Sequence, residues 1–310
     1  MTSTTGSQLK DYEVLFFDVY ATLCDWETGI YEALKPLLSK FRASAKWSRK
    51  EAIEAFTAIE VDLVAKSPEL LYRDILAKTH EVMEERLRAA SGQEVRTTTL
   101  EGDPSTVPSL SGASTSTDPP PEHTETPSPH VSFASSIKDW PLFPDTVEAL
   151  RTLAKHYKLC VLSNVDHASF AHTLAKLSGD ESHPELYQPP KSGYWFPQDT
   201  PNSKSPFTFI LTAQDVGSYK PAPRGFETAL KLAEEDPHLA GTTERGVKGR
   251  VLWVAQSLFG DIEPTSKMGL TSVFINRAGS TMGLNGAHSY SWKFETLGEM
   301  ADEVSRNVAQ

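Results

Sequence analysis

The chain is poor in cysteine and has no long apolar run in its 310 residues. Cys24 and Cys160 are its only cysteines, which excludes a disulfide framework and CxxC redox or metal spacing and favours a reducing compartment. No apolar stretch approaches the roughly 20 residues that a membrane-spanning helix needs, and residues 1–10 lack the apolar core of a secretory signal. We therefore expect a cytoplasmic protein with no membrane partner.

Basic residues are the scarcer charged class, with 30 Lys and Arg against 41 Asp and Glu and a formal net charge of -11. This balance argues against a nucleic-acid partner, because binding to phosphates needs a surplus of positive charge. Hydrophobic residues make up 39% and charged residues 23%, which is typical of a globular protein. A chain of this length buries a sizeable core as one large domain or two smaller ones.

Two segments differ from the rest in composition. Residues 101–130 contain seven Pro and eleven Ser or Thr, too little apolar surface to offset the entropy lost on ordering. We predict a disordered Pro/Ser/Thr-rich insertion over residues 91–138; a tolerated surface insertion is favoured over a phosphorylated or partner-binding linker. Residues 178–206 carry six Pro and several aromatics and are predicted to be a loop insertion that its aromatic side chains anchor. Residues 1–10 are expected to be flexible.

Five short apolar runs are separated by tens of residues, as crossover connections between parallel strands require. The predicted strands are Glu13 to Val19, Lys158 to Ser163, Phe207 to Thr212, Arg250 to Val254 and Thr271 to Ile275. Helical patterns are expected at Thr146 to His156, Ala168 to Leu177, Pro223 to Glu235 and Leu297 to Asn307. The pattern predicts an open, parallel α/β sheet built from residues 11–24 and 139–310.

Residues 25–90 change to helical periodicity without a strand. Their apolar side chains recur at helical spacing: Tyr31, Leu34, Leu37, Leu38, Phe41, then Ile53, Phe56, Ile59, Leu63, then Leu71, Ile75, Leu76, His80, Met83. Two or three amphipathic helices inserted directly after the first strand are expected to form a small cap over the sheet.

Polar residues follow four of the predicted strands, and ligands of open α/β sheets bind outside the carboxyl ends of strands. The four segments are Phe16-Phe17-Asp18-Val19-Tyr20-Ala21-Thr22-Leu23, Leu162-Ser163-Asn164-Val165-Asp166, Gly217-Ser218-Tyr219-Lys220-Pro221 and Trp253-Val254-Ala255-Gln256-Ser257-Leu258-Phe259-Gly260-Asp261. In order and spacing they resemble the four motifs of the haloacid dehalogenase (HAD) superfamily of hydrolases. The FDxYxTL form of the first segment and residues 211–221 resemble the (S)-2-haloacid dehalogenase type. The resemblance implies a HAD-like Rossmannoid parallel-sheet core with a small helical cap.

The resemblance also assigns roles to residues. Asp18 suits a carboxylate nucleophile that forms an ester with the substrate, although a strand-end Asp also caps turns. Lys220 would keep Asp18 ionised, and Asp261 would position Lys220 or the hydrolytic water, with a helix N-cap as the competing explanation. The substrate-binding residues are expected to be Tyr20, Thr22, Ser163, Asn164 and Phe226.

The chain departs from the family pattern at several positions. Phosphatases of the superfamily carry a general-acid Asp where this chain has Tyr20, and usually a magnesium-binding Asp where it has Gln256. We therefore expect no metal and no cofactor, with weak Mg²⁺ binding only if the protein is a phosphatase. Ala21 replaces a usual Gly, and residues 61–71 contain no match for the family's cap arginine, which cradles the departing halide.

Three functions remain open. The favoured one is hydrolytic displacement at C2 of a small carboxylic acid through an ester on Asp18, as in 2-haloacid dehalogenases. The alternatives are a HAD phosphatase and a catalytically weak member used for binding or regulation. The expected partner is a small anionic organic substrate, and a homodimer is implied by the resemblance alone.

Overall fold

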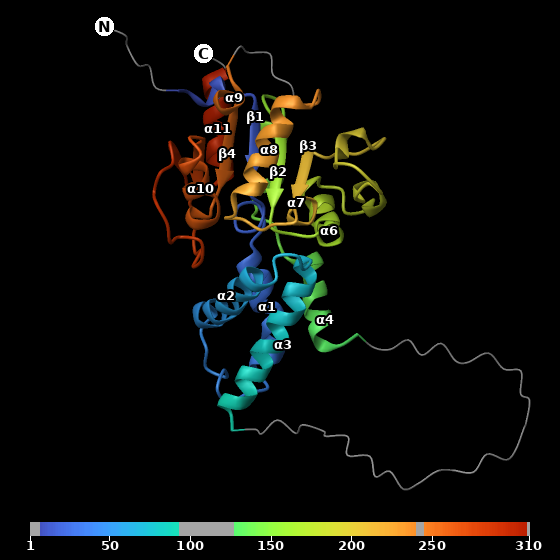
Figure 1. The fold of residues 1–310 in the computed structure, drawn as a ribbon, viewed down its shortest axis with the longest axis vertical. Coiled ribbons are helices and arrows are strands. Elements are labelled where there is room, and N and C mark those ends of the chain that lie inside the picture. Colours follow the sequence, from blue (N-terminus) through green and yellow to red (C-terminus); the bar gives the residue numbers. More distant parts are fainter. Residues whose placement is uncertain (1–6, 93–126, 240–244, 309–310) are drawn as a thin grey trace, which may run out of the picture.

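The computed structural model describes residues 7–92, 127–239 and 245–308, and it places them in two lobes (Figure 1). One lobe holds a sheet covered by helices, and the other is a cap of helices. The arrowheads of the strands point toward the cap, so the carboxyl edge of the sheet faces it. Within the described residues, no helix combines the length and the apolar character needed to cross a membrane.

The sheet has six parallel strands in the order β3-β2-β1-β4-β5-β6. They are β1 (Val14–Phe17), β2 (Lys158–Ser163), β3 (Phe207–Thr212), β4 (Val251–Ala255), β5 (Thr271–Ile275) and β6 (Trp292–Phe294). The predicted α/β fold class is confirmed. The sequence did not indicate β6, because three partly exposed residues at a sheet edge give no apolar run.

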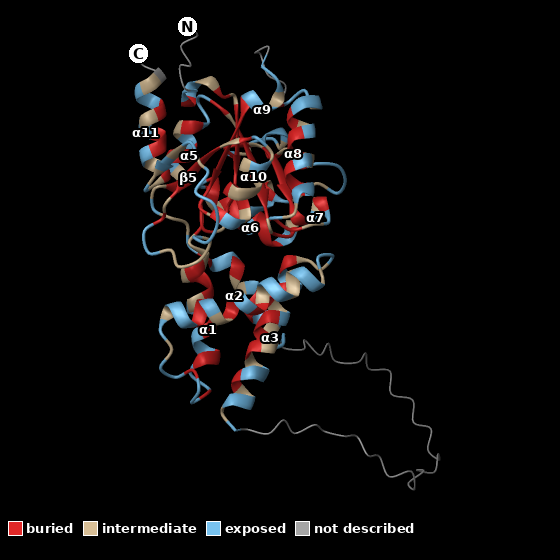
Figure 2. Ribbon diagram, turned by 60° about the vertical axis from the view of Figure 1, so that its left-hand side comes forward, coloured by how far each residue is buried: buried red, intermediate tan, exposed pale blue. Residues whose placement is uncertain are grey.

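The strands are buried on both faces. Leu15 and Phe17 of β1 join one apolar cluster, whereas Val14 and Phe16 join the other, as the alternation of side chains along a strand requires. Figure 2 shows the buried strands enclosed by helices that are exposed on their outer sides. The helices of this lobe are α5 (Thr146–Leu153), α6 (His167–Leu177), α7 (Ala213–Val216), α8 (Pro223–Glu235), α9 (Val247–Arg250), α10 (Glu263–Lys267) and α11 (Leu297–Val308).

The cap consists of α1 (Trp26–Leu38), α2 (Arg49–Lys66), α3 (Tyr72–Ala90) and α4 (Pro129–Ala134). The last of these corrects the prediction of a disordered insertion over residues 91–138. Residues 129–139 form α4 and a following 3₁₀ turn, with Phe133, Ala134 and Ile137 buried in the cap. The Pro- and Ser-rich average of the window hid these three apolar side chains. The central part of that prediction, residues 93–126, lies outside the described residues.

Two other segments, the loop of residues 178–206 and the N-terminus, place side chains in the core. In the loop of residues 178–206, Tyr187 and Trp195 are buried and Trp195 forms an isolated bridge with Ile210 of β3, whereas Tyr194 points outward. At the N-terminus, residues 1–6 lie outside the described residues, but Leu9 is buried and starts a 3₁₀ turn. The prediction of a flexible terminus is therefore wrong for residues 9 and 10, because Leu9 packs into the core.

Candidate active site

Asp18 lies on the loop directly after β1 and is buried. The loop turns back on itself, since the amides of Leu23 and Cys24 donate to the carbonyl of Val19 and the amide of Ala21 donates to the carbonyl of Cys24. Ala21 has a φ of 86°, in the left-handed region that favours glycine. The Gly that the family usually places here would adopt this conformation without strain, so Ala21 carries a conformational cost of about 1 kcal/mol.

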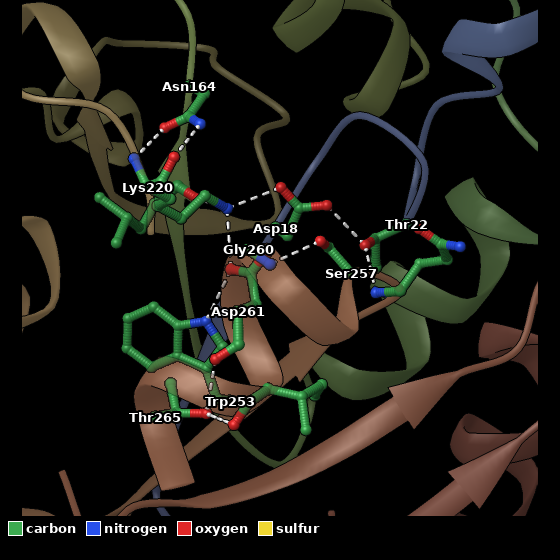
Figure 3. A network of polar contacts seen from close by, with 12 residues as sticks. Asp18, Thr22, Asn164, Lys220, Trp253, Ser257, Gly260, Asp261 and Thr265 are labelled. Atoms are coloured by element: carbon green, nitrogen blue, oxygen red, sulfur yellow. Dashed lines mark hydrogen bonds and ion pairs between the residues drawn. The ribbon is translucent and has the colours of Figure 1, made fainter. Parts of the chain in front are cut away.

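Lys220 connects Asp18 to a second carboxylate. Its Nζ donates to Oδ1 of Asp18 at 2.7 Å, to Oδ1 of Asp261 at 2.8 Å and to the carbonyl of Leu162 at 3.1 Å. Figure 3 shows the two carboxylates converging on the ammonium. All three donor positions of the ammonium are used, so it is fixed in place between the two acids.

The charges of this trio depend on one another. Burial disfavours the ammonium of Lys220, but Asp18 and Asp261 outweigh it and raise the pKa of Lys220. Burial raises the pKa of Asp261 to about 6; the ammonium of Lys220 opposes this shift and the charge of Asp18 adds to it. Two carboxylates share one cation, so Asp261 is poised to take up a proton close to neutral pH.

Thr22 holds the other oxygen of the nucleophile candidate. Its Oγ1 donates to Oδ2 of Asp18 at 2.7 Å and accepts from the backbone amide of Gln256 at 2.9 Å (Figure 3). Both oxygens of Asp18 therefore have fixed donors, and the carboxylate is held in one orientation. The contacts assign Thr22 to orienting Asp18.

Asp261 reaches the site from a π-helical turn, Leu258–Ile262, after β4. Its Oδ1 also accepts from Nε1 of Trp253 at 3.2 Å. The N-cap explanation for Asp261 is wrong, because Ser257 caps this turn by accepting from the amide of Gly260 at 2.8 Å. A Cβ at Gly260 would lie 2.7 Å from Oγ of Ser257, so a larger residue there would displace the capping hydroxyl.

The other predicted substrate-binding residues differ in what they contact. Tyr20 packs edge-on against Trp140, and its hydroxyl is hydrogen-bonded to Thr173 at 2.9 Å. The side chain of Asn164 bonds to both backbone polar groups of Lys220, accepting from its N–H at 2.7 Å and donating to its carbonyl at 3.1 Å. Asn164 thus positions the lysine.

Ser163 and Phe226 are the remaining two of the predicted substrate-binding residues. The Oγ of Ser163 is buried and has no hydrogen-bond partner among the described residues. Phe226 does not join the polar group: it is fully buried, with its ring 5.0 Å from that of Trp253, on the face of the sheet that also holds Phe16. The structure therefore gives Phe226 a packing role in place of the predicted substrate contact.

The resemblance raises Mg²⁺ as a cofactor of the phosphatase alternative. The Nε2 of Gln256 donates to Oγ of Ser280 and to the carbonyl of Met282, both at 2.9 Å, so this amide is committed to the loop after β5. Within the described parts of the chain, no group of three carboxylate, imidazole or thiolate ligands surrounds Asp18. Gln256 thus supplies no charged oxygen at the position where a hard divalent cation would favour a carboxylate.

Two arginines that the sequence reasoning missed flank the Asp18 loop. Arg277, directly after β5, is buried; its Nε donates to the carbonyl of Thr22 at 2.9 Å and its Nη1 to Asp145 at 2.6 Å. Arg49, at the start of α2, lines with Arg277 and Ala21 a cavity of about 40 Å³. The strand-end rule that found Asp18 would also have found Arg277, because it follows a buried strand.

Comparison with known proteins identifies the family of the chain. A family model of haloacid dehalogenase-like hydrolases matches residues 12–240. No curated protein matches significantly. Among solved structures, the L-2-haloacid dehalogenase of Xanthobacter autotrophicus is 13% identical with a TM-score of 0.57, covering 95% of this chain and 98% of its own.

Two further structures are similar over comparable lengths. A defluorinating L-2-haloacid dehalogenase is 16% identical with a TM-score of 0.56, covering 95% of each chain. A magnesium-bound HAD-hydrolase of Bacillus subtilis is 13% identical with a TM-score of 0.54, covering 95% of this chain and 99% of its own. At these identities the likeness shows the fold, while the family model spans well over half of the chain. The protein is therefore a member of the haloacid dehalogenase-like hydrolases.

Proposed function

We propose that the protein is a hydrolase of the 2-haloacid dehalogenase type, which displaces halide from C2 of a small carboxylic acid. An oxygen of Asp18 attacks C2, and the carbon–halogen bond breaks with its electron pair leaving on the halide. Water then attacks the carboxyl carbon of the resulting ester, which releases the 2-hydroxy acid and restores the carboxylate of Asp18.

The observation that carries the proposal is the buried trio of Asp18, Lys220 and Asp261. The ammonium of Lys220 lies 2.7 Å from Oδ1 of the nucleophile and fixes the carboxylate for an SN2 displacement. Asp261 remains as a second carboxylate with a pKa of about 6, close to the value that suits a general base toward the attacking water at neutral pH.

Tyr20 supports a halide over a phosphate ester as substrate. A departing alkoxide needs a proton, whereas a halide leaves without one. Burial raises the pKa of Tyr20 well above its usual range, and its hydroxyl is already bonded to Thr173. Tyr20 is therefore a poor general acid and a good apolar wall for a small acid.

We propose that Arg49, a cation of the cap, binds the leaving halide. It lies at the N-terminus of α2 and borders the cavity beside Ala21, three residues after Asp18. Its ion pairs are long, 3.5 Å to Asp25 and 3.8 Å to Glu27, and its Nη2 also donates to Oγ1 of Thr28 at 3.0 Å. An entering anion competes with these contacts.

Chloride release from (S)-2-chloropropionate tests the proposal. We expect turnover that survives EDTA, is lost in Asp18→Asn and falls at least tenfold in Arg49→Met, with Arg42→Met as the matched control. A single turnover with excess enzyme in H₂¹⁸O tests the ester: the label must enter Asp18 and not the product. Phosphate release that requires Mg²⁺ would instead support the phosphatase alternative, and neither activity in a folded protein would support a binding role.

A further inference from the structure

A polar cluster lies inside the cap, between α3 and α4. His80 and Glu84 are one helical turn apart on α3 and therefore share a face. His130 is the second residue of α4 and faces them. The three residues offer one ligand atom each, and these atoms all lie within 4.8 Å of one another. Within the described residues this is the only such group of three His, Cys, Asp or Glu side chains.

The two imidazoles meet through the same ring nitrogen. Nδ1 of His80 lies 2.8 Å from Nδ1 of His130, and Nε2 of His130 lies 3.9 Å from Oε2 of Glu84. Only one of the two Nδ1 atoms can donate to the other, so the second offers a lone pair. Once a metal displaces the proton between them, two imidazoles and a carboxylate supply the ligand set that borderline transition metals take.

Neighbouring side chains fix the two α3 ligands in place. The ring of Phe133 stacks on His80 with 4.5 Å between centroids, and Nη2 of Arg88 donates to Oε1 of Glu84 at 3.0 Å. Arg88 thus orients the carboxylate and leaves Oε2 directed at the histidines, as partners outside a coordination sphere do.

We propose that His80, Glu84 and His130 bind a divalent transition-metal cation of the zinc class, which fastens α4 to α3. Three protein ligands leave a fourth position for water. The ion would link two helices that are separated in the sequence, since α3 ends at Ala90 and α4 begins at Pro129. The site lies on cap helices and shares no residue with the Asp18 trio; it is independent of the proposed function.

The experiment uses the full chain, freed of metal with a chelator and then dialysed. Isothermal titration with ZnCl₂ is expected to show one binding site. At a zinc concentration 100-fold above Kd, we expect the Tm of thermal unfolding to rise by about 5 °C. His130→Ala and Glu84→Gln should each weaken zinc binding at least tenfold and remove the rise in Tm. His288→Ala, at an exposed histidine, should leave both unchanged.

A cobalt titration separates this site from the catalytic residues. Bound Co²⁺ with two imidazole ligands gives visible absorption, which should disappear in His130→Ala and persist in Asp18→Asn. MgCl₂ should give no heat at this site, because Mg²⁺ prefers oxygen ligands. Zinc affinity unchanged in both His130→Ala and Glu84→Gln, or no zinc binding by the folded parent protein, would overturn the proposal. Both readouts are independent of hydrolase activity, so failure of the proposed function leaves them intact.

Discussion

Two parts of the molecule bury a carboxylate in opposite ways. At the sheet edge, Asp18 and Asp261 lie on either side of the ammonium of Lys220. In the cap, the half-buried Glu60 of α2 has one partner among the described residues, and it is neutral: the hydroxyl of Tyr72 donates to its Oε1 at 2.8 Å. Burial raises the pKa of Glu60 to about 7, against an ordinary value of 4.5, because no cation opposes it.

The comparison shows how the fold separates a reactive carboxylate from a passive one. A neutral hydrogen bond lowers the pKa of Glu60 but does not overcome desolvation. At Asp261 burial raises the pKa to about 6 although a cation is present, and the charge of Asp18 adds to this shift. Variants that remove the cation, a neutral donor or the carboxylate itself separate the contributions of charge, hydrogen bonding and burial to this contrast.

Replacing Lys220 by Met is expected to have the largest effect. It leaves two buried carboxylates without a cation, which costs about 3–5 kcal/mol of the free energy of unfolding at pH 8. Both carboxylates then bind protons more tightly in the folded state, so the loss should shrink as the pH falls toward 5. Halide release should drop at least a thousandfold. Urea denaturation at both pH values measures the effect, with the exposed Lys231→Met as the control.

A loss of stability in Lys220→Met that does not depend on pH would contradict this account. It would mean that the variant loses packing and not electrostatic balance, and the contrast with Glu60 would then rest on burial alone.

The positions of five strands along the chain, the loop carrying Asp18 and the lysine before Pro221 could be predicted from the sequence. Buried parallel strands give continuous apolar runs, and the residue that follows each run marks the functional edge. The role of Asn164 was less accessible, since its contacts with the backbone of Lys220 join residues 56 positions apart. Phe226 was wrongly placed because residue type and alignment do not tell which face of a helix meets the core.

The cap was predicted only as a set of amphipathic helices. Glu60 was not singled out, because one acidic residue in an amphipathic pattern is typical of a solvated face, and its burial depends on how α3 packs. His130 lay within a segment expected to be disordered, so the composition of the sequence could not predict its contact with His80. Side-chain environments that depend on contacts between distant segments require the three-dimensional structure.

Removing the neutral donor at the sheet edge should have the next largest effect. Trp253→Phe deletes the hydrogen bond from Nε1 to Asp261, so the pKa of this carboxyl should rise above about 6. In a plot of kcat/KM against pH, the low-pH limb should move to higher pH by roughly half to one pH unit, because Asp261 must be ionised to act as base. Phe226→Leu, which alters packing against the same ring, should leave the limb in place. An unmoved limb in Trp253→Phe would remove Asp261 from the role of base.

Glu60→Gln should raise stability at high pH. The folded-state pKa of about 7 exceeds the ordinary 4.5, so the contribution of this group is fully present below pH 4.5 and is lost as the pH rises through 7. Gln keeps an acceptor for Tyr72 and removes the charge. Since part of the side chain still reaches solvent, we expect a gain of about 1 kcal/mol at pH 8 and none at pH 4. Equal gains at both pH values in urea denaturation would show that charge is not the cause.

Tyr72→Phe should give the smallest effect and isolates the neutral hydrogen bond. Without the hydroxyl, the charged form of Glu60 loses its donor, so the pKa of Glu60 should rise further and the fall in stability should move to higher pH. Urea denaturation between pH 5 and 9 should show the fall in stability displaced by roughly half a pH unit. In the Glu60→Gln background the same substitution should produce no pH-dependent change, because no titrating group remains to respond. A pH-dependent change that persists in the double variant would assign the effect to another carboxylate, and the contrast between cap and sheet edge would no longer rest on Glu60.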